Sequence, residues 1–328
     1  MGDKSKIQWT DATWNPVTGC TQVSPGCDHC YAEKMSNRLS HLPKYAGVSE
    51  HGRWTGRVIV HPGEVLSQPL RWQKPRRIFV CSMSDLFHSS VPFDFISQVF
   101  DVMAMADWHT FQVLTKRPGR MAHFAEKVWP CHRPEGEWPK NVWAGTSVES
   151  QKYAPRLDML ARVPAQVRFV SAEPLLGPLD LTHIGKQGIN ALTGEWSHYH
   201  EETGDVCTHW EEPLINWCIV GGESGPGARP MHPQWGRDIR DQCQQFGVPF
   251  FFKQWGEYRP LEHSDLDFSQ NEFGDCPYPL REVDSIPRLY STSHGTGYIT
   301  TRTLMIRVGK KAAGAVLDGR EWQEMPNV

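Results

Sequence analysis

Three cysteines, Cys20, Cys27 and Cys30, lie within eleven residues of one another. The segment between the first two contains Ser-Pro-Gly, which favours a turn. Cysteine thiolates are the ligands of iron–sulfur clusters, normally four to a cubane. Three cysteines would bind three of the irons and leave the fourth with an open position for a substrate or cosubstrate. The spacing therefore indicates a 4Fe-4S cluster with one reactive iron.

Two other interpretations of these cysteines remain open. A structural zinc site needs four ligands, so His29 or His41 would have to be the fourth, and neither spacing is usual for zinc. Buried structural thiols would need apolar neighbours, but the neighbours here are mainly Thr, Gln, Ser, Gly and Asp. A non-catalytic, zinc-containing nucleic-acid-binding protein is therefore the alternative function.

The elements that must position this loop repeat along the chain as a short apolar run, a polar turn and an amphipathic stretch. Runs that are apolar on both faces are typical of strands in a buried parallel sheet, and helices would connect them. We therefore expect an α/β fold, a partial or full (β/α) barrel of about six to seven parallel strands with surface insertions. The expected strands are Trp14–Gly19, Arg77–Ser82, Thr110–Thr115, Asn141–Thr146, Val167–Ser171, Asn216–Gly221 and Pro249–Lys253, and the expected helices are Ala32–Leu39, Phe93–Ala106, Gly119–Val128, Tyr153–Arg162 and Pro233–Phe246.

Charge is unevenly distributed, and this pattern suggests the domain organisation. The net charge is −3, but residues 187–215 and 257–285 each carry −6, which leaves +9 on the rest of the chain. We expect residues 1–256 to form the barrel core with an acidic surface insertion at 185–215. Residues 257–303 should be an acidic loop region, and 304–328 a C-terminal hairpin packed on the core, because Asp318-Gly319 favours a tight turn.

Polar residues follow every expected strand of the barrel. Helix capping explains one such strand end, but several polar ends meeting at one rim indicate a ligand site, because α/β folds bind ligands at the carboxyl ends of their strands. The mixed signs of charge suit a zwitterionic ligand. These ends read Ser82-Met83-Ser84-Asp85, Thr115-Lys116-Arg117, Thr146-Ser147-Val148-Glu149, Ser171-Ala172-Glu173-Pro174, Gly221-Gly222-Glu223-Ser224 and Lys253-Gln254-Trp255-Gly256.

A cysteine triad after the first strand, with an aromatic residue beside its last pair and a β/α barrel behind it, resembles the radical S-adenosylmethionine superfamily. The spacing here is C-x6-C-x2-C instead of the usual C-x3-C-x2-C. The motifs WNPVTGC, FVCSMSDLF, FQVLTKRP, WAGTSVE, FVSAEPLLGP, VGGESG and FFKQWG, and the tail RVGKKAAG, resemble more specifically an uncharacterised bacterial and phage family described by its three-Cys motif. That family has no assigned reaction.

The superfamily resemblance implies a mechanism. Cys20, Cys27 and Cys30 would bind the 4Fe-4S cluster, S-adenosylmethionine would chelate its open iron, and one-electron reduction would yield a 5′-deoxyadenosyl radical. A reductase, flavodoxin or ferredoxin would donate the electron. The implied reaction is of lyase or transferase type. Cys81 and Cys218 are candidate hydrogen donors, although buried small hydrophobes are the other interpretation of both.

The resemblance also implies that S-adenosylmethionine contacts the strand ends. Ser84 and Asp85 take the amine-binding role, because they stand where the superfamily has its Gly-Gly-Glu turn. Ser147, Glu149 and Ser171 would line the ribose and carboxylate. The full expected set is Ser82, Ser84, Asp85, Thr115, Lys116, Ser147, Glu149, Ser171, Glu173, Gly221, Gly222 and Glu223.

The basic remainder of the chain and its 14 tryptophans favour DNA or RNA as the substrate, in a modification or repair reaction. A peptide or a small metabolite is the other substrate class. Trp9, Trp54, Trp72 and Trp255 could stack on bases. The expected substrate contacts are Arg53, Arg57, Arg71, Arg76, Arg117, Lys253, Gln254 and Trp255.

Composition and the odd cysteine count bear on the compartment. With 39% apolar and 22% charged residues, the chain is not largely disordered. Nine cysteines, a polar start and the lack of a long apolar run predict a cytoplasmic protein without disulfides or a membrane span.

Overall fold

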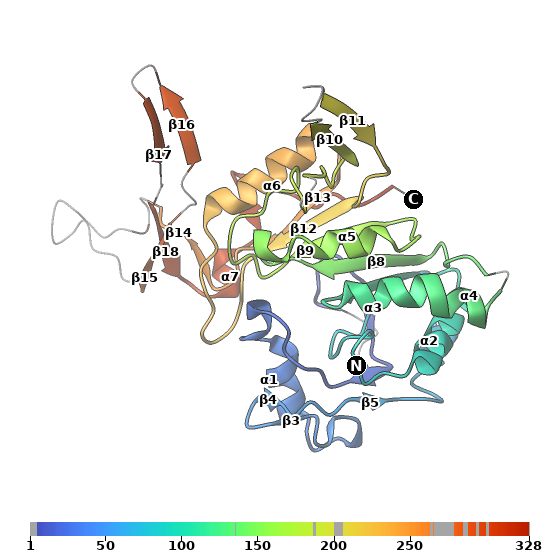
Figure 1. Cartoon of the computed structure of the whole chain (residues 1–328). Coiled ribbons are helices and arrows are strands. Elements are labelled where there is room, and N and C mark those ends of the chain that lie inside the picture. Colours follow the sequence, from blue (N-terminus) through green and yellow to red (C-terminus); the bar gives the residue numbers. More distant parts are fainter. Residues whose placement is uncertain are drawn as a thin grey trace.

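The computed structural model describes residues 5–134, 136–185, 188–199, 206–262, 265, 279–284, 288–292, 295–299 and 302–327. Its centre is a seven-stranded sheet in which every neighbouring pair is parallel, in the order β1-β6-β7-β8-β9-β12-β13 (Figure 1). These strands are Ala12–Trp14, Arg77–Val80, Thr110–Thr115, Val142–Ser147, Arg168–Ala172, Trp217–Gly221 and Phe250–Gln254. They follow one another in space as along the chain, so the sheet forms a half-barrel that is open between β1 and β13. The expected partial (β/α) barrel is confirmed.

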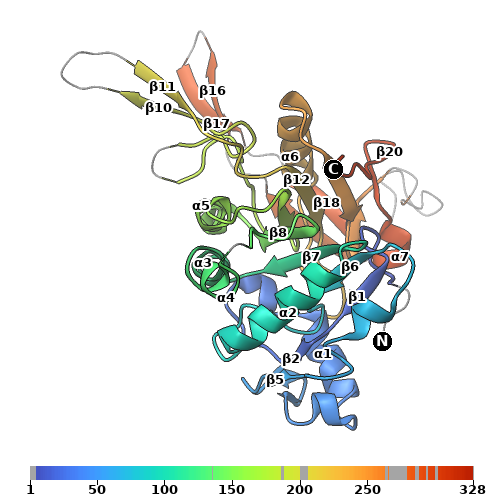
Figure 2. The ribbon, with the colours of Figure 1, turned by 90° about the vertical axis from the view of Figure 1, so that its right-hand side faces the viewer.

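The described residues form seven short helices, most of which connect barrel strands and cover the outer face of the half-barrel (Figure 2). They are α1 (Tyr31–Arg38), α2 (Phe93–Met105), α3 (Pro118–His123), α4 (Trp129–His132), α5 (Arg156–Ala161), α6 (Pro233–Gln245) and α7 (Lys310–Ala313), with a π-helical turn at Phe124–Val128. Alternate strand residues such as Ile78, Val113 and Val220 join Phe100, Leu157 and other helical residues in the larger hydrophobic core. None of the helices in the described part of the chain is long and apolar enough to cross a membrane.

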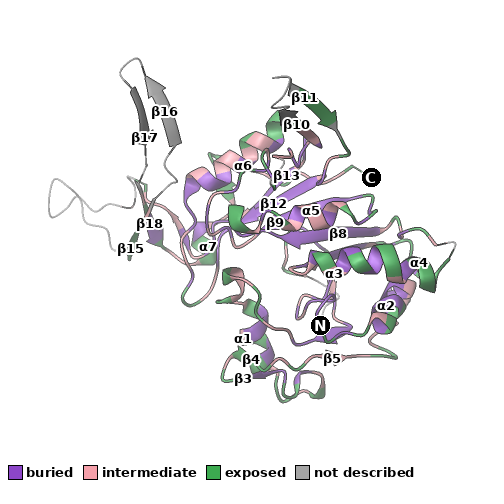
Figure 3. Cartoon of the chain, in the orientation of Figure 1, coloured by how far each residue is buried: buried purple, intermediate pink, exposed green. Residues whose placement is uncertain are grey.

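The inner face of the half-barrel is filled by aromatic side chains near the amino ends of its strands. We call this cluster the aromatic plug; it consists of Trp9, Phe79, Trp143, Val167, Phe169, Trp217, Ile219 and Phe251. Trp9 lies at its centre, with ring centroids 4.9 Å from Phe79 and 6.2 Å from Trp217. The sheet is therefore buried on both faces, which agrees with the apolar runs (Figure 3).

Smaller sheets surround the half-barrel. They pair β2 (Val17–Thr18) with β5 (Ile59–Val60), β3 (Ser49–Glu50) with β4 (Arg53–Trp54), β10 (Glu195–Tyr199) with β11 (Val206–Trp210), and β16 (Arg288–Thr292) with β17 (Gly295–Ile299), while β18 (Arg302–Arg307) lies between β14 (Tyr258–Pro260) and β15 (Leu280–Asp284). The expectation that 257–303 is a loop region is therefore wrong for β14 to β17. β14 and β15 both pair with the later strand β18, whereas β16 and β17 pair with each other as a short local hairpin. Acidic residues interrupt the pattern only in β15. Residues 266–278 of this region lie outside the described residues.

The C-terminal segment covers the free edge of β13. The expected hairpin forms between β19 (Val316–Leu317) and β20 (Arg320–Glu321), and Asp318 at its turn binds the guanidinium groups of Arg237 and Arg240 on α6. Beyond it, the chain runs antiparallel to β13. Phe252 N donates to Trp322 O at 2.8 Å, and Glu324 N donates to Phe250 O at 3.2 Å.

The first strand lies earlier than its sequence pattern indicates. The expected run Trp14–Gly19 contains Pro16, which has no N–H for a ladder, and the sheet strand is instead Ala12–Trp14. The side chain of Asn15 accepts hydrogen bonds from Ser82 Oγ at 3.2 Å and Met83 N at 2.9 Å, which link the turn after β1 to the end of β6.

Gly145 tests the packing of the aromatic plug. A Cβ at this position would lie 2.3 Å from Cζ of Phe169, so Gly145→Ala should lower the free energy of unfolding by about 1–3 kcal/mol in urea titrations. Gly119→Ala in α3 is the control, because its nearest atom outside the helix, Met159 Cγ, lies 4.0 Å away. Equal effects of the two substitutions would contradict this account of the plug.

Candidate functional site at the mouth of the half-barrel

Along several barrel strands, the side chains that point inward change from apolar to polar. Phe169 on β9 belongs to the aromatic plug, and the next inward positions are Ser171 and Glu173. Ser147 at the end of β8 and Ser171 are only 4% and 2% exposed, and neither hydroxyl has a hydrogen-bond partner within the described residues. The mouth above the plug is thus a polar space whose wall carries buried, unused hydroxyls.

Charged side chains around the mouth are buried and paired. Glu149, which is 1% exposed, binds Lys116 and lies 2.9 Å from Arg156 Nη1. Burial alone would raise the pKa of Glu149, but the two cations outweigh it and the pKa is lowered. Glu149 is therefore a buried anion that requires both neighbouring cations.

Two further acid–base pairs complete the rim. Lys253 Nζ donates to the two carboxylate oxygens of Glu173 at 2.7 and 2.8 Å. Arg229 donates to Glu223 at 2.6 and 2.9 Å. A Cβ at Gly221 would lie 3.2 Å from Glu173 Oε1, so the glycine allows close approach to this carboxylate. The paired charges suit a ligand that itself carries both signs.

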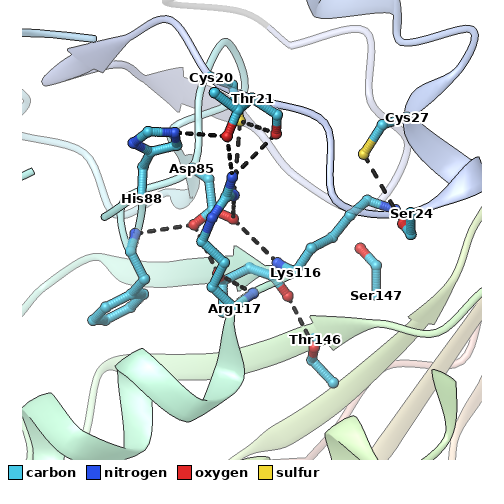
Figure 4. Close-up of polar contacts among 12 residues, drawn as sticks. Cys20, Thr21, Ser24, Cys27, Asp85, His88, Lys116, Arg117, Thr146 and Ser147 are labelled. Carbon is cyan, nitrogen blue, oxygen red and sulfur yellow. Dashed lines mark hydrogen bonds and ion pairs between the residues drawn. The ribbon is translucent and has the colours of Figure 1, made fainter. Parts of the chain in front are cut away.

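Arg117 joins the first part of the cysteine loop to the rim (Figure 4). Its guanidinium donates to Asp85 Oδ2 at 2.8 Å, to Thr21 O at 3.0 Å and to Thr21 Oγ1 at 2.8 Å, and it lies 3.8 Å from Cys20 Sγ. Asp85 also accepts from Thr115 Oγ1 and from the backbone N–H groups of Phe87 and Lys116. The carboxylate of Asp85 is therefore fully used in holding Arg117 against the loop.

The middle of the cysteine loop has two more anchors. Ser24 Oγ donates to Glu149 Oε1 at 2.5 Å, and Arg229 donates to Pro25 O at 2.7 Å and to Asp28 Oδ2 at 3.2 Å. The loop comes so close to Glu149 that a Cβ at Gly26 would lie 2.6 Å from its side chain. Charged groups that follow β7, β8 and β12 thus hold the loop across the mouth.

The three sulfurs have polar neighbours. Burial raises the pKa of Cys20 to about 12, with Asp85 adding to the rise and Arg117 opposing it. Burial also raises the pKa of Cys30, which begins α1, while the backbone N–H groups of Glu33 and Ala32 lower it and nearby Cys27 raises it. Cys27 Sγ lies 4.0 Å from Ser24 Oγ. N–H groups directed at sulfur are a feature of iron–sulfur sites.

The donor set fits an iron–sulfur cluster in its chemistry, because three sulfurs lie on one anchored loop with N–H or O–H groups beside them. Their present positions do not surround a single point. Among the described residues, no group of three His, Cys, Asp or Glu side chains is arranged to hold a metal ion, so a histidine-completed zinc tetrahedron is not formed either. Binding a cluster would require the sulfurs to turn toward one another.

Several residues singled out in the sequence lie away from this mouth. Cys218 faces the helical layer, where its thiol contacts that of Cys243. Cys81, in contrast, is buried close to the mouth, with Cys20 and Asp85 nearby. The indole of Trp255 is 5% exposed and donates to Val316 O at 2.8 Å. Gly222 lies against this segment, since a Cβ there would be 1.9 Å from Trp255 O.

The remaining predicted residues divide between the rim and the surface. Ser82 and Ser84 bind the turn after β1, through Asn15 and Val17 O. Arg71 donates to Glu64 O, and Arg76 stacks on the buried Trp72. Gln254 is buried, with its amide 3.4 Å from Glu173. Arg53 and Arg57 are exposed near the cysteine loop. Arg53 donates to Asp28 O, and the backbone oxygen of Arg57 packs so closely on Gly19 that a Cβ there would lie 2.1 Å from it.

Sequence reasoning missed three side chains that hold the site together. Ser24, Arg156 and Arg229 all bind rim carboxylates. None of them ends a strand, and the Arg229–Pro25 contact joins residues 204 positions apart. Arg156 and Arg229 lie only seven and six residues from Glu149 and Glu223, but no strand-end pattern marks them, and the contacts Ser24–Glu149 and Arg229–Pro25 join distant segments.

A family model described as "Protein of unknown function (DUF5131)" matches residues 4–326. No curated protein matches the chain. Among solved structures, a spore photoproduct lyase mutant is similar at 9% identity and a TM-score of 0.40, over 94% of this chain and 71% of that one. Spore photoproduct lyase complexed with dinucleoside spore photoproduct is similar at 10% identity and a TM-score of 0.38, over 75% of each chain. One with bound AdoMet and the same dinucleoside gives 11% identity and 0.38 over the same shares.

Removing the charge of Glu149 should destabilise the protein. Glu149→Gln leaves Lys116 and Arg156 buried without a counter-charge, so the free energy of unfolding should fall by about 3 kcal/mol in urea titrations at pH 7. Glu126→Gln is the control, because Glu126 also pairs with an arginine, Arg162, but at the surface, and its loss should leave the unfolding midpoint unchanged. Similar midpoints for the two variants would argue against a buried charge network.

Proposed function

We propose that this chain, which belongs to the DUF5131 family of proteins of unknown function, is a radical S-adenosylmethionine enzyme that acts on nucleic acid. One observation carries the proposal: the three-cysteine loop is anchored across the carboxyl mouth of an open half-barrel by Arg117, Glu149 and Arg229. Such a mouth is where β/α folds carry out chemistry. A loop held only for structure would not need sulfurs on the ligand side of the sheet.

Cys20, Cys27 and Cys30 would hold the 4Fe-4S cluster. With S-adenosylmethionine, such a cluster supplies one-electron chemistry that produces a 5′-deoxyadenosyl radical for hydrogen abstraction. The chain's own contribution is to place charge around the sulfurs. Arg117 beside Cys20 and the N–H groups at the start of α1 beside Cys30 would stabilise negative charge on the cysteine thiolates.

The polar space beneath the loop would bind S-adenosylmethionine. Ser147 and Ser171 are buried residues whose hydroxyls make no hydrogen bond within the described residues, so both would be available to a ribose or a carboxylate. The Glu173–Lys253 pair offers one group of each sign to a zwitterionic amino acid moiety. Asp85 would position Arg117 instead of binding the amine, because four donors within the chain already use its oxygens.

The charge of the chain favours one class of substrate. Outside its two acidic segments the chain carries +9, which favours a polyanion. DNA or RNA is therefore the proposed substrate, for modification or repair, and a flavodoxin- or ferredoxin-type donor or a reductase is the proposed source of the electron.

Anaerobic reconstitution with iron and sulfide tests the proposal. The chain should take up about four irons and four sulfides and absorb broadly near about 400 nm. After reduction, it should convert S-adenosylmethionine to 5′-deoxyadenosine. Cys30→Ala should lose both properties because one ligand is removed. Cys131→Ala should keep both, because Cys131 is an exposed cysteine on α4, outside the loop.

The metal content distinguishes the alternative. A colourless chain that binds one zinc and no sulfide would contradict the proposal and support a non-catalytic zinc protein. Formation of a cluster without 5′-deoxyadenosine, with the cosubstrate present and the cluster reduced, would contradict the radical reaction itself.

A further inference from the structure

A cleft of about 300 Å³ lies directly beside the cysteine loop. One wall is a face of α1, where Tyr31, Lys34 and Arg38 recur at helical spacing immediately after Cys30. The opposite wall contains Lys310 at the start of α7 and Glu257, which follows β13. Neither Lys34, Arg38 nor Lys310 belongs to the rim described above.

The cleft is positively charged. Three cations line it against one carboxylate, Glu257, which already accepts a hydrogen bond from Gly225 N at 2.9 Å. Burial and the nearby Lys253 ammonium lower the pKa of Lys310, so an anion in the cleft would relieve repulsion between the two lysines. The electrostatic influence of Lys253 also indicates that this end of the cleft lies near the barrel mouth.

The cleft also exposes an aromatic ring. Tyr31 is 55% exposed, which is unusual for a large side chain with an otherwise apolar ring, and its hydroxyl is fixed by donation to Ser82 O at 2.6 Å. Met35, one helical turn further on, is 39% exposed and lines the same cleft. A fixed, exposed ring beside cations is the arrangement on which single-stranded nucleic acids stack.

A second hollow continues the cleft on the other side of His29. Its volume is about 590 Å³, and Arg53 and Trp54 line it with Asp28 and Glu33. The two acids are occupied, since Asp28 pairs with Arg229 and Glu33 accepts from Trp54 N. His29 lines both hollows, so they adjoin at that side chain beside the cysteine loop, and we refer to the two together as the groove.

We infer that this groove binds one strand of a polynucleotide, with phosphates on Lys34, Arg38 and Lys310 and a base stacked on Tyr31. The inference rests on the proposed function for its substrate class and gives it a location. A volume of about 300 Å³ accommodates a nucleotide-sized ligand and not a duplex. A strand held there would bring its nucleotides to the edge of the mouth, beside Lys253 and the three cysteines.

Fluorescence anisotropy tests this inference. The probe is a fluorescein-labelled single strand of about 12 nucleotides, used once as DNA and once as RNA, and its binding is measured over a range of NaCl concentrations. The triple variant Lys34→Gln, Arg38→Gln, Lys310→Gln should bind at least tenfold more weakly. Its slope of log K against log salt should be smaller by about two, since each lost phosphate contact contributes about 0.7. Tyr31→Leu should weaken binding about tenfold with an unchanged slope.

The matched control removes the same charge elsewhere. Lys127→Gln, Lys140→Gln, Lys152→Gln alters three exposed lysines outside the groove and should leave affinity and slope near those of the unmodified chain. Equal losses in the two triple variants, or no binding by the unmodified chain to either strand, would overturn the inference. Tighter binding of one of the two strands identifies DNA or RNA as the nucleic acid that the groove binds.

Cys30→Ala separates this inference from the proposed function. It should abolish the cluster yet retain strand binding, because the groove's cations and ring are unchanged. Strand binding by an unmodified chain that forms no cluster on reconstitution would support the groove and refute the radical enzyme. A cluster with 5′-deoxyadenosine formation but no strand binding would refute the groove alone.

Discussion

The structure depends on pairing charges that the barrel buries at its mouth. Glu149 is almost fully buried, and it is stable as an anion only because Lys116 and Arg156 reach it. The same network carries the cysteine loop, through Ser24 on Glu149 and through Arg229 on Glu223. The stability of the loop and that of the rim are therefore coupled, so a substitution that destabilises one should destabilise the other.

The aromatic plug sets where chemistry is possible. Trp9, Trp143 and Trp217 fill the inner face near the amino ends of the strands, so a ligand can occupy only the upper part of the half-barrel. There the inward positions switch to Ser171, Glu173 and Lys253, and the loop lies over them. The depth of the plug thus sets the floor of the polar space over which the cysteine loop lies.

Much of the fold could be predicted because a sheet buried on both faces leaves continuous apolar runs. The six later barrel strands and the hairpin at Asp318-Gly319 follow from such local signals. Strands β14 to β17 were missed because each is only three to five residues long and is defined by its pairing, β14 and β15 with β18, and β16 with β17. The strand-end residues were visible in the sequence, whereas Arg229 was not, because its contact with Pro25 spans most of the chain. Trp255 looked available for stacking, but its indole is buried and bound to Val316 O.

The segment that runs along β13 has a consequence for folding in the cell. Without Trp322 and Glu324, the outer backbone groups of Phe250 and Phe252 would be unpaired at an apolar sheet edge, a template for intermolecular β-pairing. Translation produces β13 well before this segment emerges from the ribosome, so the nascent edge is exposed for an interval. This exposure should favour chaperone binding during synthesis, and chains that lack these last residues should aggregate.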